Sequence, residues 1–144
     1  MTIKQLSIFV ENRVGALLDV TSVLRENNID MRAFSVAETT DFGIVRLIVN
    51  KPGKARELLR AAGLTVVETP VIGVLLEDTP GTFHSVLETL FRARISIEYT
   101  YAFAKNSGTH KAYMMIRVED PENAAKVLTE AGFTLLTPGD AYEE

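Results

Sequence analysis

The strongest constraint on the fold of this 144-residue chain is that its second half repeats its first. Residues 6–15 align with residues 72–81 at an offset of 66 positions, and a glutamate, a glycine and several apolar positions coincide. Residues 62–64 align with residues 131–133 at an offset of 69, so the second copy has gained three residues, which we expect in the turn-rich stretch 105–110. A repeat of this size predicts two copies of one structural unit.

Each copy shows the same alternation of strand and helix patterns. Apolar residues at every second position predict strands, and apolar residues at helical spacing predict two helices per copy. In the first copy, Pro52 suits the start of the second helix and Gly63 its end. The expected strands are residues 6–10, 29–39, 42–50 and 64–69, then 71–76, 95–103, 112–118 and 133–136, and the helices are marked by residues 17–24, 52–62, 83–90 and 124–131.

This order of elements predicts an α+β fold. Right-handed crossovers turn it into a ferredoxin-like βαββαβ unit, an antiparallel sheet with both helices on one face. We expect a first module over residues 1–69 and a second over residues 70–144, with Pro70 as the only linker and a frayed acidic tail over residues 140–144. Joining the two sheets side by side would cover exposed strand edges. A homodimer would bury further apolar surface, since such small modules bury little alone.

The composition disfavours several classes of function. Lysine and arginine number 15 against 19 aspartates and glutamates, a net charge of −4, and no basic cluster is present to neutralise nucleic-acid phosphates. Without cysteine, the chain has no disulfide, thiolate metal site or cysteine nucleophile. No apolar run reaches the roughly 20 residues of a membrane helix, and the N-terminus lacks a signal-peptide pattern. We therefore expect a cytoplasmic protein that binds no nucleic acid, membrane, metal or cofactor.

The loop between the first strand and the first helix of each copy is the best candidate for a binding site. The two loops are residues 11–17 and 77–83. A helix start presents unpaired N–H groups and a positive dipole end, which favour a carboxylate. Gly15 and Gly81 let a ligand approach the backbone closely, and Asn12 and Asp78 could receive an ammonium group. One loop could therefore hold both ends of a free α-amino acid.

The same loop residues allow a purely structural explanation. Asn12 and Asp78 are good helix caps, Pro80 is a normal first-turn residue, and glycine is common in strand-to-helix turns. The occurrence of the loop in both copies, with no competing chemistry elsewhere in the sequence, favours binding.

The two loop sequences resemble the ACT domain. Its pattern is an acidic or amide residue, a variable pair, then glycine and an apolar helix start, and both ENRVGALL at residues 11–18 and EDTPGTF at residues 77–83 follow it. The resemblance covers residues 3–69 and 71–137, and the chain looks like a stand-alone tandem ACT protein without a catalytic domain. It implies that an amino acid is held where two modules meet, between the loop of one module and its neighbour.

The resemblance also implies which residues contact the ligand. A polar loop residue and the backbone at the helix start bind it, and a polar residue at the start of the second strand contacts it across the interface. Asp30 and Ser96 hold that last position, where they could equally be solvated strand ends. The first copy has Val14 where proline is common in the family, so the two sites could differ in affinity. The candidate residues are Asn12, Arg13, Val14, Gly15, Ala16, Leu17, Asp30, Asp78, Thr79, Pro80, Gly81, Thr82, Phe83 and Ser96.

These features predict an amino-acid sensor that regulates amino-acid metabolism and performs no chemistry. Ligand binding would favour one packing of modules or subunits, and a regulated enzyme or regulator would respond to that packing. One alternative is a protein-interaction subunit that binds no small molecule. A remote alternative is an acylphosphatase-like enzyme, because that ferredoxin-like family places an arginine in its first loop to hold phosphate. Arg13 could play that part, although Thr79 stands at the matching position of the second copy.

Overall fold

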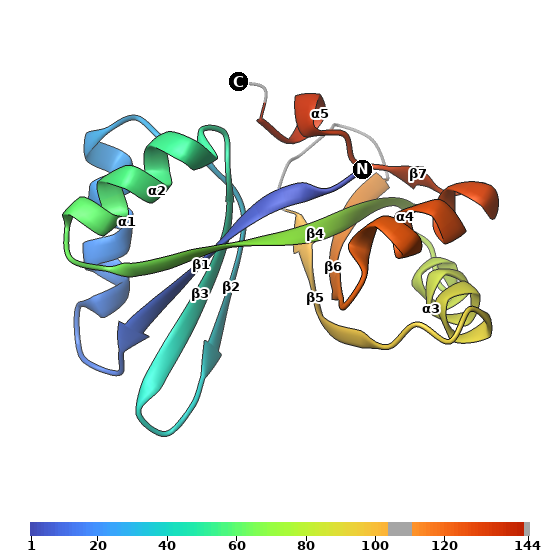
Figure 1. Ribbon diagram of the computed structural model, residues 1–144, viewed down its shortest axis with the longest axis horizontal. Helices are drawn as coiled ribbons and strands as arrows, with labels where there is room; N and C mark the ends of the chain where they lie inside the picture. The colour runs from blue at the N-terminus through green and yellow to red at the C-terminus, as the bar shows by residue number, and fades with distance from the viewer. Residues whose placement is uncertain (104–110, 143–144) are drawn as a thin grey trace. The chain divides into compact units, whose positions relative to one another are not determined.

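The computed structural model of the protein describes residues 1–103 and 111–142 (Figure 1). The expected three-residue insertion at 105–110 lies outside the described residues. The chain divides into two compact units. The first unit consists of Lys4–Thr69 with residues 141–142, and the second consists of Met1–Ile3 with Pro70–Asp140. Each unit is described by itself.

The first unit is a four-stranded antiparallel sheet with two helices. Its elements are β1 (Ile3–Glu11), α1 (Ala16–Glu26), β2 (Met31–Glu38), β3 (Phe42–Val49), α2 (Pro52–Ala61) and the first part of β4 (Thr65–Glu77). Neighbouring strands follow the order β2-β3-β1-β4. Leu6 of β1 lies opposite Leu47 of β3, and Ile8 lies opposite Val45. Because directly paired residues share a face of the sheet, these four side chains form one apolar surface.

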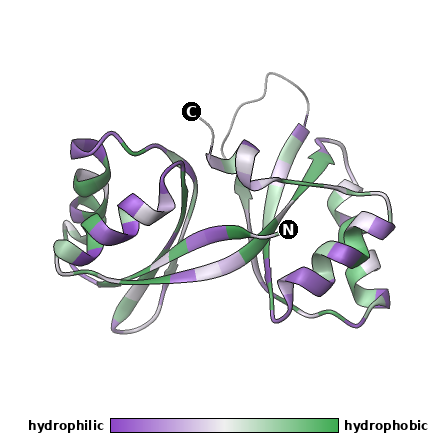
Figure 2. Ribbon diagram, turned by 45° about the horizontal axis from the view of Figure 1, so that its top comes forward, coloured by the Kyte–Doolittle hydropathy of each residue, from purple (hydrophilic) through white to green (hydrophobic). Residues whose placement is uncertain are grey.

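Both helices of the first unit cover that apolar surface. Val20 and Leu24 of α1 and Ala55 and Leu59 of α2 lie in one buried cluster with the paired residues of β1 and β3. The apolar positions of α1 recur at helical spacing, which directs them to one side of the helix. In Figure 2 the helix ribbons carry both hydrophobic and hydrophilic segments, as expected of a helix that buries only one of its sides.

The second unit repeats this arrangement. Its elements are the rest of β4, α3 (Thr82–Arg92), β5 (Ile97–Phe103), β6 (Lys111–Val118), α4 (Pro121–Glu130), β7 (Thr134–Leu135) and α5 (Pro138–Tyr142). Strand β4 is followed by β6 and then β5, and β7 pairs with β4. The strand order is therefore the same in both units. Val86 and Leu90 of α3 share a buried cluster with Ala124 and Leu128 of α4. The α+β fold with two ferredoxin-like βαββαβ units is confirmed.

Two details of the fold depart from the sequence expectations. Strand β4 runs from Thr65 to Glu77 without a break at Pro70, so the last strand of one copy and the first strand of the next are continuous. The expectation of a frayed C-terminal tail was wrong for residues 140–142, because helix α5 reaches Tyr142 and Ala141 is fully buried, whereas residues 143–144 lie outside the described residues. The backbone N–H of Lys4 donates a 2.7 Å hydrogen bond to Tyr142 Oη within the first unit, which gives the tail a packing role that an acidic composition does not predict.

Candidate functional site

The two candidate loops have the same backbone conformation at their glycines. Gly15 has φ 88° and ψ −4°, and Gly81 has φ 91° and ψ −9°, and each is the residue that precedes its helix. Both values lie in the left-handed region, where a Cβ is disfavoured. A Cβ on Gly81 would meet nothing within 4 Å, and one on Gly15 would meet only the tip of Arg13 at 3.8 Å. The glycines are therefore required by the backbone, and the space above them is open.

Neither of these helix starts is capped by a side chain. Within the described residues, α1, α2 and α3 have no side-chain hydrogen bond at their N-terminal cap, which is a left-handed glycine only in α1 and α3, whereas Asp120 caps α4 by accepting from the backbone N–H of Asn123 at 3.1 Å. The structural explanation of Asn12 and Asp78 as helix caps therefore does not hold. The N–H groups of Ala16 and Thr82 already donate to the carbonyls of Arg13 and Thr79, at 3.2 and 3.4 Å. The following N–H groups of the first turn in α1 and α3 are the ones that another acceptor would meet.

Side chains of both loops fasten them to neighbouring backbone. The Asn12 side-chain amide donates a 2.8 Å hydrogen bond to the carbonyl of Thr39 in the turn between β2 and β3. This bond uses one N–H of the Asn12 amide. The side-chain carbonyl oxygen of Asn12, the atom expected to receive an ammonium group, lies beside Gly43 of β3. In the second loop the Thr82 hydroxyl lies 2.7 Å from the carbonyl oxygen of Glu77 and 3.1 Å from that of Thr79.

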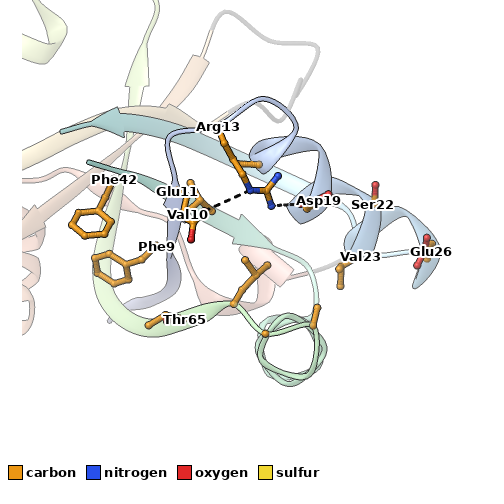
Figure 3. Close-up of a pocket in the computed structure, with 14 residues that line it drawn as sticks. Phe9, Val10, Glu11, Arg13, Asp19, Ser22, Val23, Glu26, Phe42 and Thr65 are labelled. Carbon is orange, nitrogen blue, oxygen red and sulfur yellow. Dashed lines mark hydrogen bonds and ion pairs between the residues drawn. The ribbon is translucent and has the colours of Figure 1, made fainter. Parts of the chain in front are cut away.

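Arg13 is held by two carboxylates. Its Nη2 lies 2.6 Å from Asp19 Oδ2, and its Nε lies 3.8 Å from Glu11 Oε2 (Figure 3). The hydrogen bond and charge of Asp19, with a smaller contribution from Glu11, raise the pKa of Arg13 above its ordinary value. The guanidinium therefore stays charged and is already paired with acidic groups.

A hollow of about 690 Å³ opens beside this loop in the first unit. Figure 3 shows Arg13 on one side of it and the rings of Phe9 and Phe42 on another. Three carboxylates against one guanidinium give the hollow a negative charge, which favours an ammonium group over an anion. It is lined by Phe9, Val10, Glu11, Arg13, Ala16, Asp19, Ser22, Val23, Glu26, Phe42, Ala62, Gly63, Leu64 and Thr65.

Only two of the candidate residues of the first copy, Arg13 and Ala16, line this hollow. Val14 is fully exposed and Leu17 is 44% exposed. The sequence analysis missed Asp19 and Glu26, although their spacing from Ala16 places all three on one stripe of α1. That polar stripe beside the apolar one was the signal that could have identified them.

The remaining candidates are divided between other places. In the second unit, Asp78, Thr79, Pro80 and Gly81 are exposed, whereas Phe83 packs against the buried cluster under α3. Ser96 is exposed directly before β5. These placements leave the ligand contacts of the second copy as a prediction.

Asp30 lines a second hollow of the first unit. This hollow is bordered by Arg25, Asn28, Ile29, Asp30, Arg32 and Asn50. The Asp30 carboxylate accepts a 2.7 Å bond from Arg32 Nη1, and its backbone N–H donates to Asn50 Oδ1 at 2.9 Å. The first unit therefore does not bring Asp30 together with the residues around Gly15.

Two searches of the described residues set limits on the chemistry. No group of three histidines, aspartates or glutamates that could hold a metal ion occurs in residues 1–103 and 111–142. In the same residues, each helix is too short or too polar to cross a membrane.

Comparison with known families gives one match. The sequence matches the family described as an ACT domain pair over residues 1–140. Among curated protein sequences, none matches the chain.

Solved structures resemble the whole chain. A crystal structure of a protein from Bacteroides thetaiotaomicron is 40% identical, with 100% of this chain and 98% of that chain covered and a TM-score of 0.91. The regulatory subunit of aspartate kinase from Thermus thermophilus, in a ligand-free form, is 15% identical, with coverage of 90% and 91% and a TM-score of 0.63. The corresponding subunit from Thermus flavus is 16% identical, with coverage of 90% and 93% and a TM-score of 0.58.

Proposed function

The chain belongs to the family of ACT domain pairs, and from that membership we propose that it is a regulatory protein that senses a free amino acid. The ligand binds at the loops that precede α1 and α3, and its occupancy changes the activity of a partner enzyme or regulator. The aspartate kinase regulatory subunits of Thermus, which share the fold, are examples of proteins with a regulatory role.

One observation carries this proposal: the same uncapped helix start occurs in both units above a left-handed glycine. A carboxylate that accepts from the first-turn N–H groups would supply the missing cap and would interact with the positive end of the helix dipole. The open space above Gly15 and Gly81 gives such a carboxylate room to reach the backbone.

The acidic groups beside each loop suit the other end of an amino acid. In the first unit Glu11 and Asn12 precede the helix start in the sequence, with the Asn12 side-chain oxygen beside Gly43 of β3, and in the second unit Glu77 and Asp78 hold the matching positions. An ammonium group near these oxygens gains charge-assisted hydrogen bonds. A zwitterion therefore fits the loops better than a simple anion does.

The contacts of Arg13 support binding over phosphate chemistry. An acylphosphatase-like site would need this guanidinium free for a phosphate, but Asp19 and Glu11 already pair with it. Two carboxylates at this place would repel a phosphate group. The interaction subunit without a ligand is the stronger alternative.

Regulation requires that the ligand bind two states of the protein unequally. Pairs of ACT modules and homodimers of the chain supply such states if their packing differs with and without ligand. Any effect on a partner is then limited to the difference in the ligand's affinity for the two states.

Thermal unfolding in the presence of each of the twenty amino acids at millimolar concentration tests the proposal. A ligand at 100 times its Kd adds about 2.7 kcal/mol to the free energy of unfolding. For a chain of this size that raises the Tm by several degrees. One amino acid, or a few related ones, should give a saturable increase.

Variants then locate the binding site. Asp78→Asn removes a charge at the second loop, and Asp41→Asn is the matched control because Asp41 is also an exposed aspartate in a bend. Asn12→Ala tests the first loop. The increase in Tm should diminish in the loop variants and persist in the control. If none of the twenty amino acids changes the Tm, the sensing proposal is wrong and the interaction subunit becomes the better explanation.

A further inference from the structure

Arg32 occupies an irregular position in strand β2. The pairing of β2 with β3 shifts register between Met31, which lies opposite Val49, and Ala33, which lies opposite Ile48. Arg32 therefore has no partner in the register. Such bulges redirect a side chain and recur next to binding sites. Here the bulge turns an arginine toward the hollow at the end of α1.

The guanidinium of Arg32 is buried and only partly satisfied. Its side chain is 12% exposed, and its Nη1 pairs with Asp30 Oδ2 at 2.7 Å. Its Nε and Nη2 atoms are shielded from solvent and have no hydrogen-bond partner among the described residues. Buried N–H groups are almost always bonded. The Nε–Nη2 edge is also the side of a guanidinium that matches two oxygens of one carboxylate or phosphate.

The hollow that Arg32 borders carries a positive charge. Arg25 and Arg32 border the hollow together with a single carboxylate, that of Asp30, and with the polar side chains of Asn28 and Asn50. The charge is opposite to that of the hollow beside Arg13, which has three carboxylates and one guanidinium. Two hollows of one unit thus favour ligand groups of opposite sign.

The second unit has a bulge at the matching position, and the charged side chain there is paired within the unit. Its register shift lies between Ile97 and Tyr99, at Glu98, the residue that matches Arg32 in the repeat. Glu98 pairs with Arg117 at 3.4 Å. Phe91 stands in the place of Arg25, and Glu119 stands in the place of Asn50. The positive hollow is therefore a property of the first unit and is not required by the fold.

We propose that the hollow at the end of α1 is a second binding site, which takes a small oxyanion between Arg32 and Arg25. The ligand class is a carboxylate or phosphate group with two oxygens in the plane of the guanidinium. Within the first unit, this site lies at the opposite end of α1 from the loop at Gly15.

Asp30 acts as the internal competitor for this ligand. Its carboxylate is 60% exposed and holds one edge of the guanidinium, so an entering oxyanion displaces it and turns the Nε–Nη2 edge into the hollow. The backbone of Asp30 stays fixed, because its carbonyl oxygen accepts from the Asn50 N–H at 3.2 Å and its N–H donates to the Asn50 side chain. Removal of the Asp30 charge should therefore strengthen anion binding.

The test follows the Nε–H resonance of Arg32 by NMR in the full-length chain at constant ionic strength, with sodium chloride as the reference salt. One titration uses inorganic phosphate and another uses succinate, which distinguishes a phosphate ligand from a carboxylate ligand. A saturable shift is expected with one of them. Arg32→Lys keeps the charge but loses the two-pronged donor, and its affinity should fall about tenfold. Asp30→Asn should bind several-fold more tightly than the unmodified chain.

The controls separate this site from general attraction of anions. Arg92→Lys changes an exposed arginine of the second unit and should leave the affinity unchanged. If neither anion gives a saturable shift, or if Asp30→Asn binds more weakly, the proposal is refuted. Equal affinities of Arg32→Lys and the unmodified chain would also refute it. Should Arg32→Lys fail to fold, Asp30→Asn and Arg92→Lys still decide the question, because the proposal requires tighter binding in the first and unchanged affinity in the second.

Discussion

Replacement of Gly15 by alanine isolates the energetic cost of the loop that precedes α1. Gly15 has a φ of 88°, and a Cβ at this position would meet only Arg13 Nη1 at 3.8 Å, which is an ordinary contact with a flexible side chain. The cost of Gly15→Ala is therefore a backbone cost, about 1–2 kcal/mol for an L-residue in the left-handed region. The unfolding equilibrium constant should rise about 5- to 30-fold. Urea unfolding followed by circular dichroism measures this change.

Two further substitutions show whether the backbone is the cause. Gly53→Ala, in the first turn of α2, also meets nothing within 4 Å but has no positive φ, so it should stabilise the first unit by about 0.4–1 kcal/mol. Gly15→Asn introduces a larger side chain that tolerates the left-handed region, so it should cost less than Gly15→Ala. A steric cost would give the opposite order. If asparagine is worse than alanine, or if Gly15→Ala is neutral, the argument from the backbone is wrong.

Two predictions concern the second unit and the C-terminal helix. Gly73→Ala would place its Cβ 2.8 Å from Leu136 Cβ and 3.0 Å from Met115 Sδ. This overpacking should lower the free energy of unfolding, measured in urea, by about 1–3 kcal/mol. An unchanged free energy of unfolding would show that the space around Gly73 is not tightly packed. Burial, opposed by the hydrogen bond from the Lys4 N–H and reinforced by the charge of Glu68, raises the pKa of Tyr142. Because the folded state then keeps the phenol proton longer than the unfolded state does, stability should fall as the pH rises through about 10. Tyr142→Phe should lose part of this decline, measured as unfolding free energies at neutral and alkaline pH, and an unchanged decline would show that Tyr142 is not its source.

The repeat and the hydrophobic periodicity sufficed to predict the fold. Alternation along β1 and helical spacing along α1 fix which side chains can share a face, and Gly63 and Gly132, at φ 90° and 93°, end their helices as their type predicts. Fraying of residues 140–142 was mispredicted because the hydrogen bond from Lys4 to Tyr142 joins residues 138 positions apart. Local composition contains no information about such contacts.

The candidate site was predictable in part. Glycine at positions 15 and 81 indicated a special backbone, and the structure places both in the same left-handed conformation. The roles of the polar loop residues were not predictable. Asn12 could have capped α1, but instead it donates to Thr39, which the hairpin between β2 and β3 brings beside it. Which acceptor an amide finds depends on distances that arise only after the strands pair.

Residue types a few positions apart were therefore enough to predict the elements, their order and the two glycine helix starts. Tertiary structure alone decided the charge of the two hollows. Asp19 and Glu26 line one of them together with the residues that follow α2, and Arg32, at a register shift in β2, borders the other together with Arg25. Periodicity predicts which face of an element is buried, but a bulge breaks the period by one residue, and only the pairing with β3 shows where it falls.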